Sequence, residues 1–111
     1  MILLTAAAPP ETPSGVYGVS SSSDPGSAWV SWTAPEDNNS TITIYEVMYT
    51  RTNATPAENS INVTGNPAPT SVDIAGLITG TGYTFKVRAI NGVGSGAQSE
   101  ESDEVSRAMN D

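Results

Sequence analysis

The stretch GLITGTGYTFKVRAINGVGSG, residues 76–96, decides the fold class of this chain. Its middle part, YTFKVRAI (83–90), alternates strictly: positions 83, 85, 87 and 89 are apolar, and Thr, Lys and Arg stand between them. A period of two is typical of a β-strand with one buried face. We therefore expect Tyr83, Phe85, Val87 and Ala89 to point into a core.

The same stretch places Leu77 six residues before Tyr83. A tyrosine at the start of a late strand can bond its hydroxyl group to the backbone a few residues upstream, while its ring fills the end of the core. This arrangement is the tyrosine corner of immunoglobulin-like sandwiches. We expect such a corner here, with Leu77 packed against it.

Six further segments have strand character and are separated by Gly, Pro, Asn and Asp at a spacing of roughly ten residues. They are residues 16–20, 27–33, 41–50, 59–65, 69–77 and 104–108. No segment shows a helical period. The pattern predicts an all-β fold, a seven-stranded antiparallel β-sandwich. Its expected core also includes Trp32, Tyr45, Val47, Val72 and Ile74.

Over residues 13–108 the chain resembles a fibronectin type III domain, a member of the Ig-like sandwiches. The resemblance is carried by Pro13, Trp32, the TAPED that follows it, ITIYEVMY (42–49), the spacing of Leu77 and Tyr83, and YTFKVRAINGVGSGAQS (83–99). It implies one sheet of three strands and one of four, with Trp32, Tyr45, Leu77 and Tyr83 in the core. The style of GLITGTGYTF is more similar to microbial secreted or viral members. Residues 91–98, NGVGSGAQ, lack the Arg-Gly-Asp tripeptide, so integrin binding is not implied.

The chain divides into an arm, a domain and a short tail. Residues 1–14 read as a Pro-rich N-terminal arm or linker, residues 15–108 as the domain, and residues 109–111 as a tail. Pro-rich backbone favours an extended, semi-rigid spacer. Ile2, Leu3 and Leu4 cannot join a core that begins near Val16. We expect them either to contact a neighbouring molecule or to form only a tail.

Composition excludes several function classes. The net charge is −8 with four Lys and Arg residues, which argues against a nucleic-acid partner. There is no Cys and no His, and no apolar run approaches the roughly 20 residues of a membrane span. The acids in EESDE (100–104) diverge in an extended segment and suit a solvated edge. We expect no enzyme, no catalytic residues, no cofactor and no bound metal.

Two other features bear on partners. Trp29 alternates with Trp32 and should face outward, where the neighbouring strand covers it in part; the less favoured alternative is stacking on a sugar or a neighbouring subunit. A carbohydrate ligand has no further support in the sequence. Asn-x-Ser/Thr triplets begin at Asn38, Asn39, Asn53 and Asn62, in loops or edge strands where a glycan can be accommodated.

Two functions remain open. The first is a non-catalytic interaction or spacer module of a secreted or surface protein, which binds a protein partner. The alternative is a structural subunit of an extracellular or virion assembly, such as a decoration, fibre or filament protein. In that case the N-terminal arm docks on neighbouring copies. Both place the chain outside the cell, on its surface or on a virion.

Overall fold

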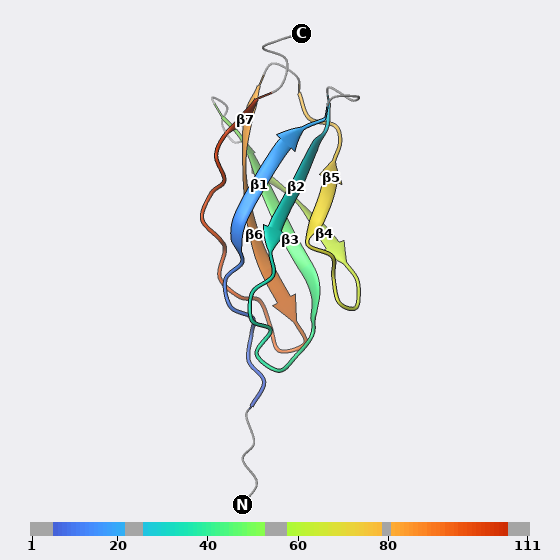
Figure 1. Ribbon diagram of the computed structural model, residues 1–111, viewed down its shortest axis with the longest axis vertical. Helices are drawn as coiled ribbons and strands as arrows, with labels where there is room; N and C mark the ends of the chain where they lie inside the picture. Colours follow the sequence, from blue (N-terminus) through green and yellow to red (C-terminus); the bar gives the residue numbers. More distant parts are fainter. Residues whose placement is uncertain (1–5, 22–25, 53–57, 79–80, 107–111) are drawn as a thin grey trace, which may run out of the picture.

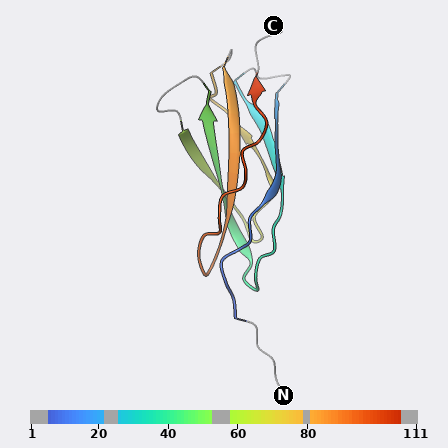
Figure 2. The same ribbon diagram turned by 90° about the vertical axis from the view of Figure 1, so that its left-hand side faces the viewer.

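The computed structural model describes residues 6–21, 26–52, 58–78 and 81–106. Within them the chain forms two antiparallel sheets, ordered β1-β2-β5 and β4-β3-β6-β7. The strands are β1 (Ser14–Ser20), β2 (Ala28–Thr33), β3 (Ile42–Arg51), β4 (Glu58–Thr64), β5 (Ser71–Ile74), β6 (Gly82–Asn91) and β7 (Val105–Ser106). The two sheets lie face to face as layers (Figures 1 and 2). The expected antiparallel β-sandwich is confirmed.

Six strands of four to ten residues carry this sandwich, whereas β7 has only two residues. The closing strand expected over 104–108 is therefore reduced to a short pairing with β6, and residues 107–108 lie outside the described residues. The segment before β7 explains the reduction. The N–H groups of Gly96, Ser99 and Ser102 donate to the carbonyl groups of residues 89, 87 and 85, each at 2.8 Å. The donors are three residues apart along this segment, whereas their acceptors are two residues apart along β6. In a regular β-ladder both strands advance by two residues between such bonds.

Serine side chains complete this irregular pairing. The N–H of Val87 donates to Ser99 Oγ at 2.9 Å, and the N–H of Phe85 donates to Ser102 Oγ at 3.0 Å. Buried backbone groups need partners, and on this side of β6 two hydroxyl groups supply them in place of strand carbonyls. The edge of the four-stranded sheet is thus closed by side chains.

The core lies between the sheets and is built from their alternating inward residues. Buried there are Ala28, Val30, Trp32, Ile42, Tyr45, Val47, Val63, Ile74, Tyr83, Phe85, Val87 and Ala89. The rings of Trp32 and Tyr45 meet edge to face, with centroids 5.1 Å apart. Val72 and Leu77, expected to be buried, are only partly so and pack against the rim of the core. Val72 lies on β5 at the edge of its sheet, and Leu77 follows the end of β5.

The tyrosine corner forms as expected. The N–H of Ile78 donates to the Tyr83 hydroxyl oxygen at 2.9 Å, five residues upstream. The Tyr83 ring is buried, so its hydroxyl group both satisfies a backbone donor and ties the 75–78 segment to β6. The N–H of Leu77 donates to Gly26 O at 2.8 Å and holds the same segment to the start of β2.

We expect Tyr83→Phe to lower the free energy of unfolding by about 1–3 kcal/mol, because the Ile78 N–H loses its acceptor while the ring volume is kept. Urea unfolding followed by tryptophan fluorescence measures the change. Tyr17→Phe is the matched control, since Tyr17 is exposed, and it should change stability by less than about 0.5 kcal/mol. Equal stability of the Tyr83 variant and the parent would show that the corner bond contributes nothing.

A second expectation concerns alkaline pH. Burial raises the pKa of Tyr45 above its ordinary value of 10.0. Between pH 10 and the raised pKa, the unfolded chain releases this proton while the folded protein keeps it. The free energy of unfolding therefore falls as pH rises from 10 through the raised pKa. Urea unfolding at a series of pH values above about 9 measures this fall. The free energy of unfolding should decline less with pH for Tyr45→Phe than for the parent. Parallel declines would exclude Tyr45 as the source.

Candidate interaction surfaces

The acidic segment at residues 100–104 is bonded to the neighbouring sheet at separate points. Glu101 Oε2 accepts a bond from Thr84 Oγ1 at 3.2 Å, and Glu104 Oε2 accepts one from Thr52 Oγ1 at 2.7 Å. Across the described residues, no group of three or more Asp and Glu side chains converges as a metal site would require. The same residues include no helix long and apolar enough to cross a membrane. The acidic residues 100–104 form a charged border along the β6-β7 edge of the four-stranded sheet.

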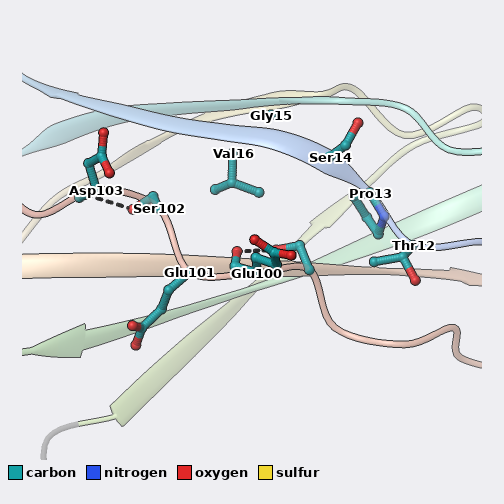
Figure 3. A pocket seen from close by; sticks show the side chains of 10 residues that line it. Thr12, Pro13, Ser14, Gly15, Val16, Glu100, Glu101, Ser102 and Asp103 are labelled. Atoms are coloured by element: carbon teal, nitrogen blue, oxygen red, sulfur yellow. Dashed lines mark hydrogen bonds between the residues drawn. The ribbon is translucent and has the colours of Figure 1, made fainter.

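A groove of about 540 Å³ runs between β1 and this border (Figure 3). Residues 12–16 form one wall and residues 99–103 the other. Val16 projects from β1 toward the opposite wall, whereas Glu101 points away from it (Figure 3). The hydroxyl groups of Ser99 and Ser102 donate to the neighbouring carbonyls of Glu100 and Asp103, both at 2.9 Å. Each of these two hydroxyl groups thus accepts from a β6 N–H and donates to a carbonyl of its own segment.

The opposite pole of the sandwich is organised by Asn91, at the end of β6. Its side chain is buried. Nδ2 donates to Ala8 O at 2.7 Å and to Asp37 O at 2.9 Å, while Oδ1 accepts from the N–H groups of Val93 and Gly94 at 2.8 and 3.2 Å. One amide group therefore joins the arm, the loop after β2 and the loop after β6. The sequence marked Asn91 as the start of a loop and gave no sign of this role.

Asn38 adds a second link between the arm and the domain. Its Nδ2 donates to Pro9 O at 2.7 Å and to Glu11 Oε2 at 2.8 Å. Its backbone carbonyl group accepts from the N–H of Ala8 at 3.1 Å. Asn38 has a φ of 55°, in the left-handed region that Asn tolerates better than most residues. Glycosylation at Asn38 stays a prediction; a glycan would be attached to this same Nδ2 atom and would compete with its bonds to the arm.

The remaining glycosylation candidates differ in position. Asn39 has a φ of 70° and is exposed in the same turn, and Asn62 is exposed on the edge strand β4. Asn53 lies outside the described residues. A glycan on Asn39 or Asn62 stays a prediction.

The described part of the arm is docked on the domain. Ala8–Glu11 are bonded there, since the N–H of Glu11 also donates to Glu36 O at 3.0 Å. The expected role of the Pro-rich segment as a spacer that carries Ile2, Leu3 and Leu4 stays a prediction. Pro10 is buried and passes so close to Gly96 that a Cβ atom there would collide with its carbonyl group. Ile2, Leu3 and Leu4 lie outside the described residues, so their contact with a partner stays a prediction.

A third surface is the outer face of the β1-β2-β5 sheet. Trp29, Tyr17 and Val19 are 48%, 60% and 41% exposed there. The outward orientation expected for Trp29 is what the structure has. The neighbouring strands leave almost half of this residue in contact with solvent, which is unusual for a tryptophan and marks this face as a candidate contact surface.

We expect Asn91→Ala to lower the free energy of unfolding by about 2–4 kcal/mol, because it leaves two carbonyl groups and two N–H groups without their partner. Hydrogen exchange at the amides of Ala8 and Glu11 should also become faster, since the arm loses an anchor. Asn62→Ala, on the exposed edge, is the control and should do neither. Unchanged exchange in the Asn91 variant would mean that the arm is held without this side chain.

Comparisons with known proteins agree with this architecture. A family model described as fibronectin type III domain matches residues 11–105. Protein sidekick-1 of Gallus gallus is 32% identical over 96 residues, which are 86% of this chain and 4% of that protein. The present chain thus spans only a small part of the length of this curated relative.

Solved structures give the same result. The structure of titin kinase and its flanking domains is 33% identical, with a TM-score of 0.69, over 89% of this chain and 17% of that chain. A crystal structure of consecutive titin domains is 32% identical, with a TM-score of 0.71, over 88% of this chain and 32% of that chain. The microbial or viral style expected from the sequence finds no support among these relatives. Because the family model matches residues 11–105, which is most of the chain, the chain belongs to the fibronectin type III domain family.

Proposed function

We propose that this chain is a non-catalytic interaction and spacer module of a secreted or surface protein. The observation that carries the proposal is the path of the chain. The described arm meets the sandwich at one pole, and β7 lies near the other (Figure 1). A module that is entered at one end and left at the other holds its neighbours apart by its own length.

The docked arm supports the spacer role. A flexible linker would let a preceding segment turn freely about the domain. Here Asn91 and Asn38 bind Ala8 and Pro9, and Pro10 is buried against the domain. These contacts fix the direction in which the chain approaches the sandwich, so that a spacer built on this domain is stiff at its entrance.

The matched relatives support a modular role, since this chain corresponds to 4%, 17% and 32% of the chains that it resembles. A domain of this family therefore occurs there as one part of longer polypeptides. The proposed location outside the cell or on its surface rests on the family resemblance. The proposed partner is another protein, and the surfaces available for it are the groove beside β1 and the outer face of the β1-β2-β5 sheet.

The alternative, a structural subunit that docks on its copies through the arm, is less well supported. Residues 8–11 of the arm are already bonded to their own domain. The charge of −8 also opposes close packing of identical copies at low ionic strength.

Size-exclusion chromatography with light scattering on the full chain tests the two functions. We expect a monodisperse monomer across a wide range of protein concentration, because the module needs no copy of itself to complete its fold. Deletion of residues 1–7 should leave this result unchanged, since it keeps the bonds that Ala8, Pro9 and Glu11 make to the domain. Oligomers that grow with concentration and disappear on this deletion would instead support the assembly subunit.

A further inference from the structure

The outer face of the β1-β2-β5 sheet carries two aromatic side chains in a defined arrangement. Strand register places Val19 opposite Trp29, and Trp29 opposite Asp73, in one row across the three strands. The next row contains Tyr17, Ser31 and Ser71. Tyr17 is therefore the diagonal neighbour of Trp29, at a distance that two aromatic side chains can bridge.

The pairing type brings Trp29 and Asp73 close together. The N–H of Trp32 donates to Thr70 O at 3.1 Å, just beyond the paired residues Ser31 and Ser71. Hydrogen-bonded and non-hydrogen-bonded pairs alternate along an antiparallel ladder, so the pair of Trp29 and Asp73 is of the non-hydrogen-bonded kind. Side chains approach one another most closely in such pairs. The Asp73 carboxylate and the Trp29 indole group therefore start from Cβ atoms about 4.5–5.5 Å apart, on the same face of the sheet.

Among the described residues, the three strands of this face carry only negative charge. The β1, β2 and β5 strands contain no Lys or Arg. The basic residues that the structure describes, Arg51, Lys86 and Arg88, are all on β3 and β6 in the other sheet, and Arg88 is paired with Glu46 at 2.6 Å. The acidic wall of the groove, residues 99–103, lies opposite residues 12–16 at the start of β1, whereas Val19 and Trp29 are near the other end of that strand. The carboxylate that belongs to the aromatic face itself is that of Asp73.

We propose that this face binds a partner protein through a cationic side chain, an arginine or lysine, which stacks on Trp29 and Tyr17 and pairs with Asp73. Trp is the strongest aromatic partner for a cation, and arginine stacks on aromatic rings while it bonds a carboxylate. Trp, Tyr and Arg are also the residues enriched where binding energy concentrates in protein interfaces. A second copy of the chain is a poor occupant, because the same face would bring negative charge to negative charge. The inference names the partner chemistry for the interaction role proposed above and rests on that role.

The test uses the full chain labelled with ¹⁵N and a minimal probe, an acetylated and amidated Gly-Arg-Gly peptide. Gly-citrulline-Gly is its neutral control, because citrulline keeps the shape of arginine without the charge. We expect the arginine peptide to shift the Trp29 indole N–H and the amides of residues 17, 19, 29 and 73 most strongly. The citrulline peptide should bind more weakly by about two- to fivefold, the range of an exposed cation–π contact.

Variants separate this site from the general negative charge. Trp29→Thr and Asp73→Asn should each lower the affinity for the arginine peptide by about two- to fivefold. Glu58→Gln removes one charge from an exposed position on β4, in the other sheet, and should have no effect. Tyr17→Thr provides a second aromatic variant should the Trp29 variant fold poorly. The dispersion of the amide spectrum reports folding in every case.

Three results would overturn the proposal. Equal binding of the arginine and citrulline peptides would mean that the face suits a neutral ligand, such as a carbohydrate. Shifts centred on residues 100–104, with equal effects of Asp73→Asn and Glu58→Gln, would show attraction by bulk charge. An oligomer that Trp29→Thr dissociates would make a second copy the occupant. Only the last of these also counts against the module function, so the two failures are distinguishable.

Discussion

The structure depends on the burial of one row of side chains, those that β6 sends between the sheets. Tyr83, Phe85, Val87 and Ala89 are all buried, and strand β3 pairs with β6 along almost its entire length. A strand buried in this way must have its backbone bonded on both sides, because unpaired N–H and C=O groups inside a protein are costly. The rest of the fold supplies these partners and closes the two ends of the row.

The partners differ from one part of β6 to the next. At its start, the Tyr83 hydroxyl group holds the chain that arrives from β5. Along its free side, Ser99 and Ser102 provide both backbone N–H donors and hydroxyl acceptors. At its end, the Asn91 amide gathers the arm and two loops. Gly18 of β1 approaches Phe85 so closely that a Cβ atom would meet its ring at 3.0 Å, and this close approach brings the edges of the sheets together.

The sequence predicts the fold because the deciding signals are local. Strict alternation around Phe85 and the spacing of Leu77 and Tyr83 are read within a few residues. Asn91 and the serine pairing could not be predicted in the same way, since Asn91 acts on residues 83 and 54 positions away. The Ser99 and Ser102 contacts likewise depend on where the chain lies after it leaves β6. A Ser-x-x-Ser spacing beside a buried strand is the signal that could have indicated them.

The candidate site likewise contains features that are local in the sequence and features that are not. The outward direction of Trp29 follows from its alternation with Trp32, which is local. The neighbour that gives this ring a chemical preference, Asp73, is 44 positions away and is found only through the register of β2 and β5. Tyr17 joins the site through the register of β1 and β2. A local pattern thus predicts that a side chain is exposed, whereas strand pairing decides what surrounds it.

The positions of these surfaces are compatible with both parts of the proposed role. The arm is held at one pole by Asn38 and Asn91, and β7 lies near the other, so the path of the chain uses the two ends of the sandwich (Figure 1). The Trp29 and Tyr17 side chains point outward from the β1-β2-β5 sheet, whereas the arm is bonded to Asn38 and Asn91 at the opposite pole from β7. The row of Val19, Trp29 and Asp73 is one pair from the end of its sheet, and Gly18 of β1 lies close to Val105 of β7. A partner bound on this face would therefore lie nearer to β7 than to the arm, so the proposed binding and the stiff connection at the arm use different parts of the surface.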